Sequence, residues 1–221
     1  MSKRFLTVVF ACIALGFTIS VHSAEKGKDK DKGKAAEKEF DAKCIVSGAP
    51  AKEASYVGFR GKKLYFCCNN CPKAYKADPD KFLAKANHQL LSTKQISQVA
   101  CPITGKPINE EKTVEIAGTK VGFCCDGCKG KAEKAGDDAI ALVFASFDKG
   151  FTLQTACPVS GKPIAADQKV SFKGQDVYFC CPNCPAAFEA DPKKFASKVP
   201  QLVEQRKKNR TGKKDKKEKD S

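Results

Sequence analysis

The sequence has almost no histidine. Its 221 residues include only His22, in an apolar N-terminal stretch, and His88, in a polar stretch where we expect it at the surface. Mixed cysteine–histidine metal sites are therefore excluded as the general design, as is repeated histidine acid–base catalysis. Serine–histidine–acid sets, phosphate-binding glycine loops and paired catalytic carboxylates are also missing from the sequence. These absences predict a protein that is not an enzyme.

Cysteine is abundant, with 13 residues, and 12 of them form three sets of four with the same spacing. In each set a long interval of constant length separates the first cysteine from an adjacent pair, and a fourth cysteine follows shortly after the pair. The sets also recur at nearly constant intervals along the chain, which indicates three copies of one module. The sets are Cys44, Cys67, Cys68 and Cys71; Cys101, Cys124, Cys125 and Cys128; and Cys157, Cys180, Cys181 and Cys184.

Each module has about 40 residues after its first cysteine, which is too few for a stable hydrophobic core without help. Domains of this size generally need a metal or disulfides. The cysteines therefore have at least a structural role. The predicted organisation is a signal peptide at 1–24, a charged linker at 25–40, modules at 41–90, 98–148 and 154–203, and a basic tail at 204–221.

The N-terminus has the pattern of a signal peptide. Lys3 and Arg4 precede an apolar run, which ends in small residues at Ser23 and Ala24. A membrane-anchored form is the alternative, because about 17 apolar residues is the lower limit for a bilayer span. We expect an exported protein, either periplasmic or secreted.

Two charged segments, Glu25 to Glu39 and Glu204 to Ser221, alternate lysine with acids and carry much of the formal charge of +15. Such segments bury little apolar surface and are expected to be disordered. The basic tail could hold an anionic cell-envelope surface, although a solubilising role is the simpler interpretation. No aromatic residues interleave with its charges, which argues against nucleic acid as a partner. No small organic substrate is expected.

Each module has a glycine at the same distance from its first cysteine, at Gly61, Gly118 and Gly174. Apolar residues alternate on both sides of this glycine, which predicts a β-hairpin whose second strand ends at the cysteine pair. A tight glycine-containing turn is predicted directly after each first cysteine. The alternating residues are Val57, Phe59, Leu64 and Phe66; Val114, Ile116, Val121 and Phe123; and Val170, Phe172, Val177 and Phe179.

Short helices are predicted after the last cysteine of the outer modules, over Pro72 to Ala77 and Pro185 to Ala190. Asp78-Pro79 and Asp191-Pro192 predict the start of a second helix. The middle module lacks this signature and has instead an apolar run from Ala139 to Phe147, which predicts a helix packed against a neighbouring module. The expected fold class is α+β.

Thiolates that converge from the leading turn and the strand–helix junction select metals such as zinc or copper(I). On a helical first turn, Cys67 and Cys71 would face the same side, whereas Cys68 and Cys71 have the spacing of a zinc knuckle. We expect three strong thiolate ligands in each site. The fourth position would go to the spare cysteine, water or a partner's ligand, and the sequence does not distinguish which member of each pair binds.

Disulfides and redox chemistry are the two alternatives to metal binding. An even number of cysteines in an exported chain also suits a disulfide framework, although a disulfide between adjacent cysteines is strained. Cys68 and Cys71, with their counterparts, have the spacing of a redox dithiol, but no thioredoxin-like βαβ pattern surrounds them.

The run from Gly61 to Cys71 and the residues Tyr75, Asp78-Pro79 and Phe82 resemble the YHS family of small metal-binding domains. The third module is as similar from Gly174 through Phe195. The related TRASH pattern, one cysteine followed after a long interval by two cysteines four apart, is met in all three modules. Both families are related to treble-clef zinc fingers, so the resemblance implies three treble-clef-like modules that bind heavy metals for trafficking, sensing or resistance.

The chain departs from the YHS pattern at one position in each leading turn. Many YHS domains have a cysteine where this chain has Ser47, Thr104 and Ser160, and a serine at the second residue of the cysteine pair. One ligand position has thus been relocated. The overall prediction is an exported protein for metal buffering, trafficking or resistance; the alternative is a cell-envelope interaction protein whose cysteines only staple its modules.

Overall fold

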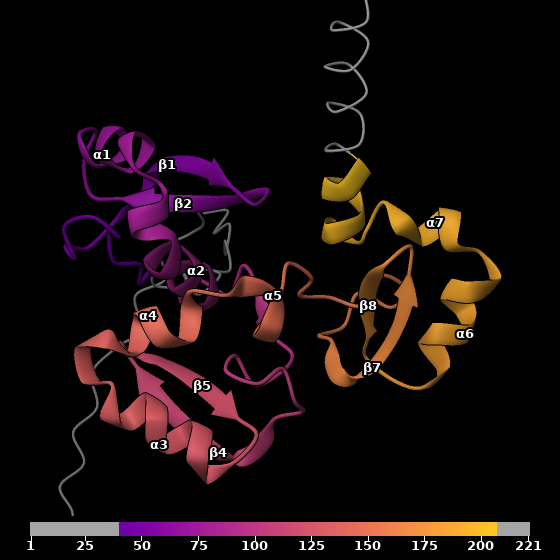
Figure 1. The fold of residues 1–221 in the computed structure, drawn as a ribbon. Helices are drawn as coiled ribbons and strands as arrows, with labels where there is room; N and C mark the ends of the chain where they lie inside the picture. The colour runs from indigo at the N-terminus through magenta and orange to yellow at the C-terminus, as the bar shows by residue number, and fades with distance from the viewer. Residues whose placement is uncertain (1–39, 207–221) are drawn as a thin grey trace, which may run out of the picture. The chain divides into compact units, whose positions relative to one another are not determined.

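The computed structural model describes residues 40–206. The predicted signal peptide at 1–24, the linker up to residue 39 and the tail from residue 207 lie outside this range. The predicted α+β class is confirmed, because each module consists of a two-stranded hairpin followed by short helices (Figure 1). None of the helices within residues 40–206 has the length and hydropathy needed to cross a membrane.

The three modules share a hairpin followed by two helices, and module 2 has additional short elements. In module 1 the elements are β1 (Lys52–Phe59), β2 (Lys62–Phe66), α1 (Cys71–Ala77), a 3-10 turn η1 (Asp80–Phe82) and α2 (Leu83–Ser92). Module 2 has β3 (Ser97–Gln98), β4 (Asn109–Ile116), β5 (Thr119–Phe123), α3 (Asp126–Lys134), η2 (Gly136–Asp138), α4 (Ala139–Phe144), α5 (Phe147–Gly150) and β6 (Phe151–Thr152). Module 3 has β7 (Ala165–Phe172), β8 (Gln175–Phe179), α6 (Asn183–Ala190) and α7 (Pro192–Ala196).

The predicted glycine turns close the three hairpins. In module 1, Phe59 pairs with Lys62 across Arg60 and Gly61, which have φ values of 51° and 70°. Two consecutive residues with positive φ define a type I′ turn, whose twist matches that of the strands it joins. The counterparts Ala117-Gly118 and Lys173-Gly174 have the same geometry. The two turn residues therefore set the hairpin register in each module. As a result, the strand-end cysteine has the same position relative to the hairpin in all three modules.

The leading cysteine opens a tight turn, as predicted. In module 1 the N–H of Gly48 donates to the carbonyl of Cys44 at 2.8 Å, and the N–H of Cys44 donates to Ala49 at 2.8 Å. Gly48 has a φ of 76°, a conformation that glycine adopts at little cost. Modules 2 and 3 repeat these two bonds.

The helices begin where the sequence indicates, with one local difference. Asp191 caps α7, since its carboxylate accepts the N–H of Lys194 at 3.3 Å. Asp78 accepts the N–H of Lys81 at 3.2 Å in the same way. In module 1, however, the chain first forms the 3-10 turn η1 and only then continues as α2.

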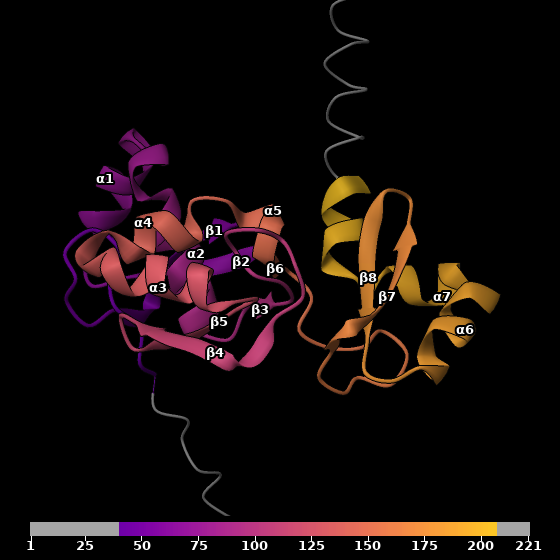
Figure 2. The same cartoon turned by 60° about the horizontal axis from the view of Figure 1, so that its bottom comes forward.

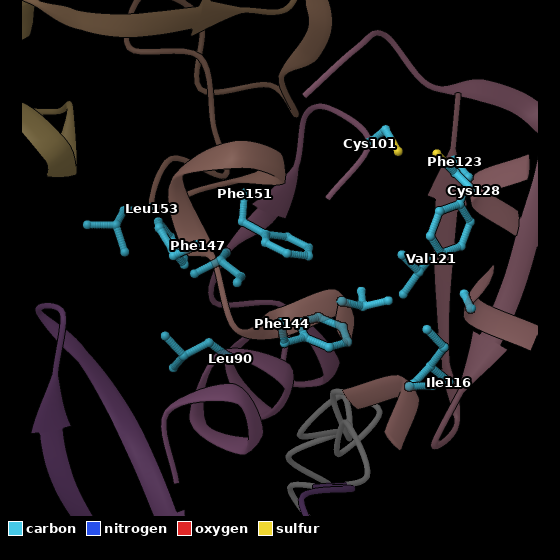
Figure 3. Close-up of a cluster of buried hydrophobic side chains, with 14 residues drawn as sticks. Leu90, Cys101, Ile116, Val121, Phe123, Cys128, Phe144, Phe147, Phe151 and Leu153 are labelled. Carbon is cyan, nitrogen blue, oxygen red and sulfur yellow. The ribbon is translucent and has the colours of Figure 1, made fainter. Parts of the chain in front are cut away.

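The helix α4 of module 2 packs against α2 of module 1, as predicted for the apolar run, although α4 ends at Phe144 and Phe147 begins α5 (Figure 1 and Figure 2). Asn87, which has no exposed surface, donates to the carbonyl of Phe144 at 2.8 Å. Leu90 of α2 belongs to the same buried cluster as Phe144, and Figure 3 shows the two side chains next to each other. Modules 1 and 2 thus share part of a core, which compensates for the small size of each.

Two predicted boundaries differ from the observed elements. The strand β6 lies beyond residue 148, the predicted end of module 2, and pairs with β3. Module 2 therefore extends to Phe151 and Thr152. At the C-terminus a helix runs over residues 200–206. The prediction of disorder from residue 204 is therefore wrong for its first three residues, which continue a helix whose Leu202 is buried in the core of module 3.

Candidate metal centres

Three cysteines converge in each module. One comes from the leading turn, one follows the end of the second hairpin strand, and one lies in the first turns of the next helix. In each set the three Sγ atoms all lie within 4.8 Å of one another. The triads are Cys44, Cys67 and Cys71; Cys101, Cys124 and Cys128; and Cys157, Cys180 and Cys184.

The sulfur spacing fits a tetrahedral metal ion. A zinc–sulfur bond of about 2.3 Å places two ligand sulfurs about 3.8 Å apart when the coordination is tetrahedral. The Sγ atoms of Cys67 and Cys71 are 3.6 Å apart, and the corresponding separations are 3.7 Å in modules 2 and 3. A metal of this size would therefore need little movement of the chain. These distances exceed the disulfide bond length of about 2.05 Å, and all twelve cysteines within residues 40–206 are free thiols.

The triads occupy the boundary between core and solvent. Cys44 and Cys71 are buried in the cluster of apolar side chains around Leu64 and Phe66, with 2% and 6% of their surface exposed. Cys67 is only partly buried. Modules 2 and 3 show the same gradient of exposure, and Figure 3 shows Cys101 and Cys128 at one edge of their cluster. Each triad is thus held on two sides by the core and open on the third.

The leading cysteine lies in an environment that favours its thiolate. Burial raises the pKa of Cys44, but hydrogen bonds from the Ser47 hydroxyl and from the backbone of Ser47, Cys67 and Val46 outweigh burial and lower it to about 6. The pKa of Cys157 falls to about 6 and that of Cys101 to about 7, through the equivalent bonds. The turn therefore favours the thiolate form of one cysteine in each module.

The helix cysteine behaves in the opposite way. The hydrogen bond with Cys68, together with burial and the neighbouring thiols, raises the pKa of Cys71 to about 12. Burial and the neighbouring thiols raise the pKa of Cys128 to about 12, and the thiol of Cys181 with burial does the same for Cys184. A bound metal must displace the proton of this thiol, since only thiolates are ligands.

The second cysteine of each adjacent pair lies beside the triad and not within it. Cys68 is exposed, and its Sγ is 3.5 Å from that of Cys71. In module 3 the Cys181 and Cys184 sulfurs are 3.4 Å apart. In module 2 the exposed Cys125 lies 3.7 Å from the sulfur of Cys124. The structure thus brings nine predicted ligands into triads and leaves one accessible thiol next to each.

The expected helical turn between Cys67 and Cys71 is wrong. Residues 67–70 form a bend, and α1 begins only at Cys71. The bend still brings the two sulfurs together, because it turns the chain sharply between the strand and the helix. Cys124 and Cys180 likewise precede their helices. Spacing by itself therefore predicted the convergence of the sulfurs but not the backbone conformation that produces it.

Hydroxyl groups replace the cysteine that many YHS domains have in the leading turn. The Oγ of Ser47 lies 3.2 Å from the sulfur of Cys67. Thr104 and Ser160 make the same contact, at 3.2 Å with Cys124 and 3.1 Å with Cys180. The substituted position therefore faces the site and can donate a hydrogen bond to a thiolate.

His88 does not lie at the surface as predicted. It is part of α2, its Nε2 lies 3.1 Å from the carbonyl of Ile116, and its ring meets Phe144 edge-on at 5.1 Å. Because a carbonyl only accepts hydrogen bonds, Nε2 carries the proton. Burial is the main reason why the pKa of His88 is lowered. The residue belongs to the contact between modules 1 and 2 and has no role in a triad.

Sequence reasoning missed three glutamines that contact the backbone next to the triads. These are Gln89, Gln98 and Gln154. A signal was present for two of them, since Gln98 and Gln154 each stand three positions before the leading cysteine of their module. The equivalent position in module 1 is Asp41, so nothing in the repeat pointed to Gln89.

The fold and the sulfur triads define a tandem array of small cysteine modules of the metal-binding type. The third module matches the family model of the YHS domain over residues 156–199, which confirms the predicted resemblance for that module. Modules 1 and 2 share its hairpin, its leading turn and its sulfur triad. Comparison with curated proteins and with solved structures gave no match.

Proposed function

We propose that this chain is an exported, non-enzymatic protein that binds one thiophilic metal ion in each of its three modules. Its role would be to buffer or transfer zinc or copper(I), or to confer resistance to heavy metals. The observation that carries the proposal is the set of three triads with sulfurs at the spacing of metal ligands. The signal-peptide pattern of residues 1–24 supports export.

The accessible thiol beside each triad favours exchange over permanent storage. Structural zinc sites are closed, with four protein ligands that solvent does not reach. Here the strand-end cysteine is partly exposed, and the second cysteine of the adjacent pair is exposed in modules 1 and 2 and partly exposed in module 3. An incoming thiol could therefore bond to the metal while the buried cysteines still hold it. Such ligand exchange needs no unfolding of the module.

The alternative is an interaction protein whose metals or disulfides only staple the modules. The burial of Cys44, Cys71 and their counterparts among core side chains favours this role, since removal of a metal there would disturb the core. In that case the basic segments or the module surfaces would bind an envelope partner.

Metal content and thiol count decide first whether the sites bind metal. The mature chain, purified without chelator or reductant, should contain about three zinc or copper ions, with thiols that react only after chelation. A protein without metal and with few free thiols would refute the proposal and support disulfide staples.

Exchange kinetics then separate a transfer protein from a staple. A chelator of moderate affinity is added to the loaded protein, while metal release and circular dichroism are followed together. A buffering protein releases metal with most of its secondary structure retained. Release that occurs only as the circular dichroism signal collapses would identify a structural site.

A further inference from the structure

The second strand of each hairpin has an outer edge that no other described strand covers. Within residues 40–206, β2, β5 and β8 each pair only with the preceding strand of their own hairpin. The backbone groups of the opposite edge therefore need other hydrogen-bond partners. In all three modules a glutamine side chain supplies them at the residue two positions before the strand-end cysteine.

The glutamine amide pairs with both backbone groups of that residue. In module 1 the N–H of Tyr65 donates to Gln89 Oε1 at 2.7 Å, and Gln89 Nε2 donates to the Tyr65 carbonyl at 2.8 Å. In module 2, Gln98 makes the same pair with Gly122 at 2.9 and 2.7 Å. In module 3, Gln154 pairs with Tyr178 at 3.0 and 2.5 Å. The amide thus acts as a one-residue third strand.

The same amide nitrogen also holds the other cysteine segment. Gln89 Nε2 donates to the carbonyl of Lys43, the residue before Cys44, at 2.7 Å. Gln98 donates to Ala100 at 3.1 Å and Gln154 to Ala156 at 3.0 Å, and these residues precede Cys101 and Cys157. One rigid amide therefore ties the leading turn to the hairpin strand, the two segments that supply two of the three triad sulfurs.

These amides are positioned to act as a fixed brace. Gln89 and Gln154 are 2% and 0% exposed, so water does not compete for their hydrogen bonds. In module 3 a second glutamine, Gln201, donates to Gln154 Oε1 at 3.1 Å and to the carbonyl of Asp176 at 2.8 Å. All four hydrogen-bonding positions of the Gln154 amide are thereby oriented by neighbours.

Module 1 obtains its amide from a different part of the chain. The glutamines of modules 2 and 3 come from just before the leading turn, whereas Gln89 comes from α2, after the helix that follows the triad. In all three cases the glutamine and the strand residue are 24 positions apart, with the order reversed in module 1. The glutamine follows the strand in module 1 and precedes it in modules 2 and 3, yet it makes the same hydrogen bonds. This indicates that the contact between the glutamine and the strand matters to the module and is not a by-product of one local sequence.

We propose that Gln89, Gln98 and Gln154 are positioning residues of the three metal sites. Each would fix the distance between the leading cysteine and the strand-end cysteine before metal binds, so that little ordering remains to be done on binding. The inference rests on the proposed metal binding and extends it to residues that do not touch the metal. Outer residues that orient ligands typically change metal affinity by about 10- to 100-fold.

The test uses the full chain with Gln154→Ala, and Gln168→Ala as the matched control. Gln168 lies in the same module, and its side chain donates a hydrogen bond to Asp167 at 2.8 Å, away from the triad segments. Zinc is titrated in competition with a chromophoric chelator. We expect the Gln154→Ala chain to keep two sites of unchanged affinity and to bind zinc about 10- to 100-fold more weakly at the third, and the control to match the wild type.

Cobalt(II) binding gives a signal that would not change if Gln154 had only a structural role. The visible bands of a thiolate-bound cobalt ion report the geometry of its ligands. The positioning role predicts altered bands for one of the three cobalt ions in Gln154→Ala and faster loss of that ion to a chelator. Lower resistance to denaturant, with unchanged bands and an unchanged loss rate at saturation, would overturn the proposal.

Gln154→Met keeps the experiment decisive if the alanine variant does not fold. Methionine has nearly the same length and volume but makes none of the amide's hydrogen bonds, and it preserves packing better than alanine. A Met variant that binds three metal ions with wild-type affinity would overturn the proposal, and selective weakening of one site would support it. Failure of the wild-type chain to bind metal would instead refute the proposed function.

Discussion

The sulfur atoms of Cys67 and Cys71 lie 3.6 Å apart, although a bend and not a helix separates the two residues. The equivalent sulfurs lie 3.7 Å apart in both of the other modules. Three copies that agree this closely point to a common requirement at the sulfurs, for which a single tetrahedral metal ion provides the physical reason.

The two cysteines nearest the helix in module 3 should differ in importance. Cys184→Ser removes a triad sulfur and should abolish metal binding at one of the three sites, as measured by bound zinc per chain. Cys181→Ser should retain three bound ions, because its sulfur lies outside the triad. It should instead slow the transfer of metal to an external thiol. Equal loss of bound metal in both variants would contradict this division of roles.

The hydroxyl of the leading turn should stabilise the neighbouring thiolate. Ser160→Ala removes the contact of 3.1 Å with Cys180. One hydrogen bond is worth about 1 kcal/mol, so affinity at the third site should fall roughly fivefold. Competition titration checks the value, and Thr104→Val should give the same loss at the second site. Unchanged affinity in both variants would show that the hydroxyls do not contribute to binding.

The shared core should depend strongly on Phe144. This side chain is fully buried and stacks on Phe151 at 5.1 Å, so Phe144→Ala should reduce the free energy of unfolding by about 3–5 kcal/mol. Leu142→Ala is the matched control, because Leu142 lies on the same helix with 43% of its surface exposed. Denaturant unfolding measures both. A similar loss in the two variants would indicate that α4 contributes only through its helical structure.

His88 should make the contact between modules 1 and 2 sensitive to acid. Burial lowers its pKa in the folded chain, with a smaller contribution from the charge of Lys43. The folded state therefore binds this proton less readily than the unfolded state, whose pKa is about 6.5. The contribution of neutral His88 to the free energy of unfolding is complete above that pH. It is lost as the pH falls through the pKa that His88 has in the folded chain.

The variant His88→Gln isolates this effect from the titration of the thiols. Glutamine retains an N–H donor for the Ile116 carbonyl but does not ionise. The difference in the free energy of unfolding between wild type and variant should be constant above about pH 7 and should shift against the wild type below about pH 6.5. A difference that does not change with pH would show that the ring remains uncharged or that its charge is tolerated.

Much of each module was predictable because it depends on contacts between near neighbours in the chain. Period-two alternation and a glycine in the left-handed region specify the hairpin, and Asp-Pro specifies the start of a helix. The repeat itself identified all twelve cysteines and the YHS resemblance, since spacing is preserved wherever the same backbone path is preserved.

Choices between chemically equivalent residues needed the tertiary structure. Cys67 and Cys68 are adjacent and identical in type, and only the direction of the bend after β2 places the sulfur of Cys67 within the triad. His88 had polar neighbours and looked like a surface residue, yet the packing of α2 on α4 half-buries it.

The sequence by itself determined the number of modules, their hairpins and the cysteines available to each site. The tertiary structure decided which sulfurs meet and that modules 1 and 2 share a core. It also decided that Gln89 makes the hydrogen bonds in module 1 that Gln98 and Gln154 make in the other modules, since the equivalent sequence position is Asp41. The physical reason is distance along the chain. Turns and strands are specified by residues a few positions apart, whereas an amide from α2 reaches Tyr65 and Lys43 only after the helix has packed against the hairpin.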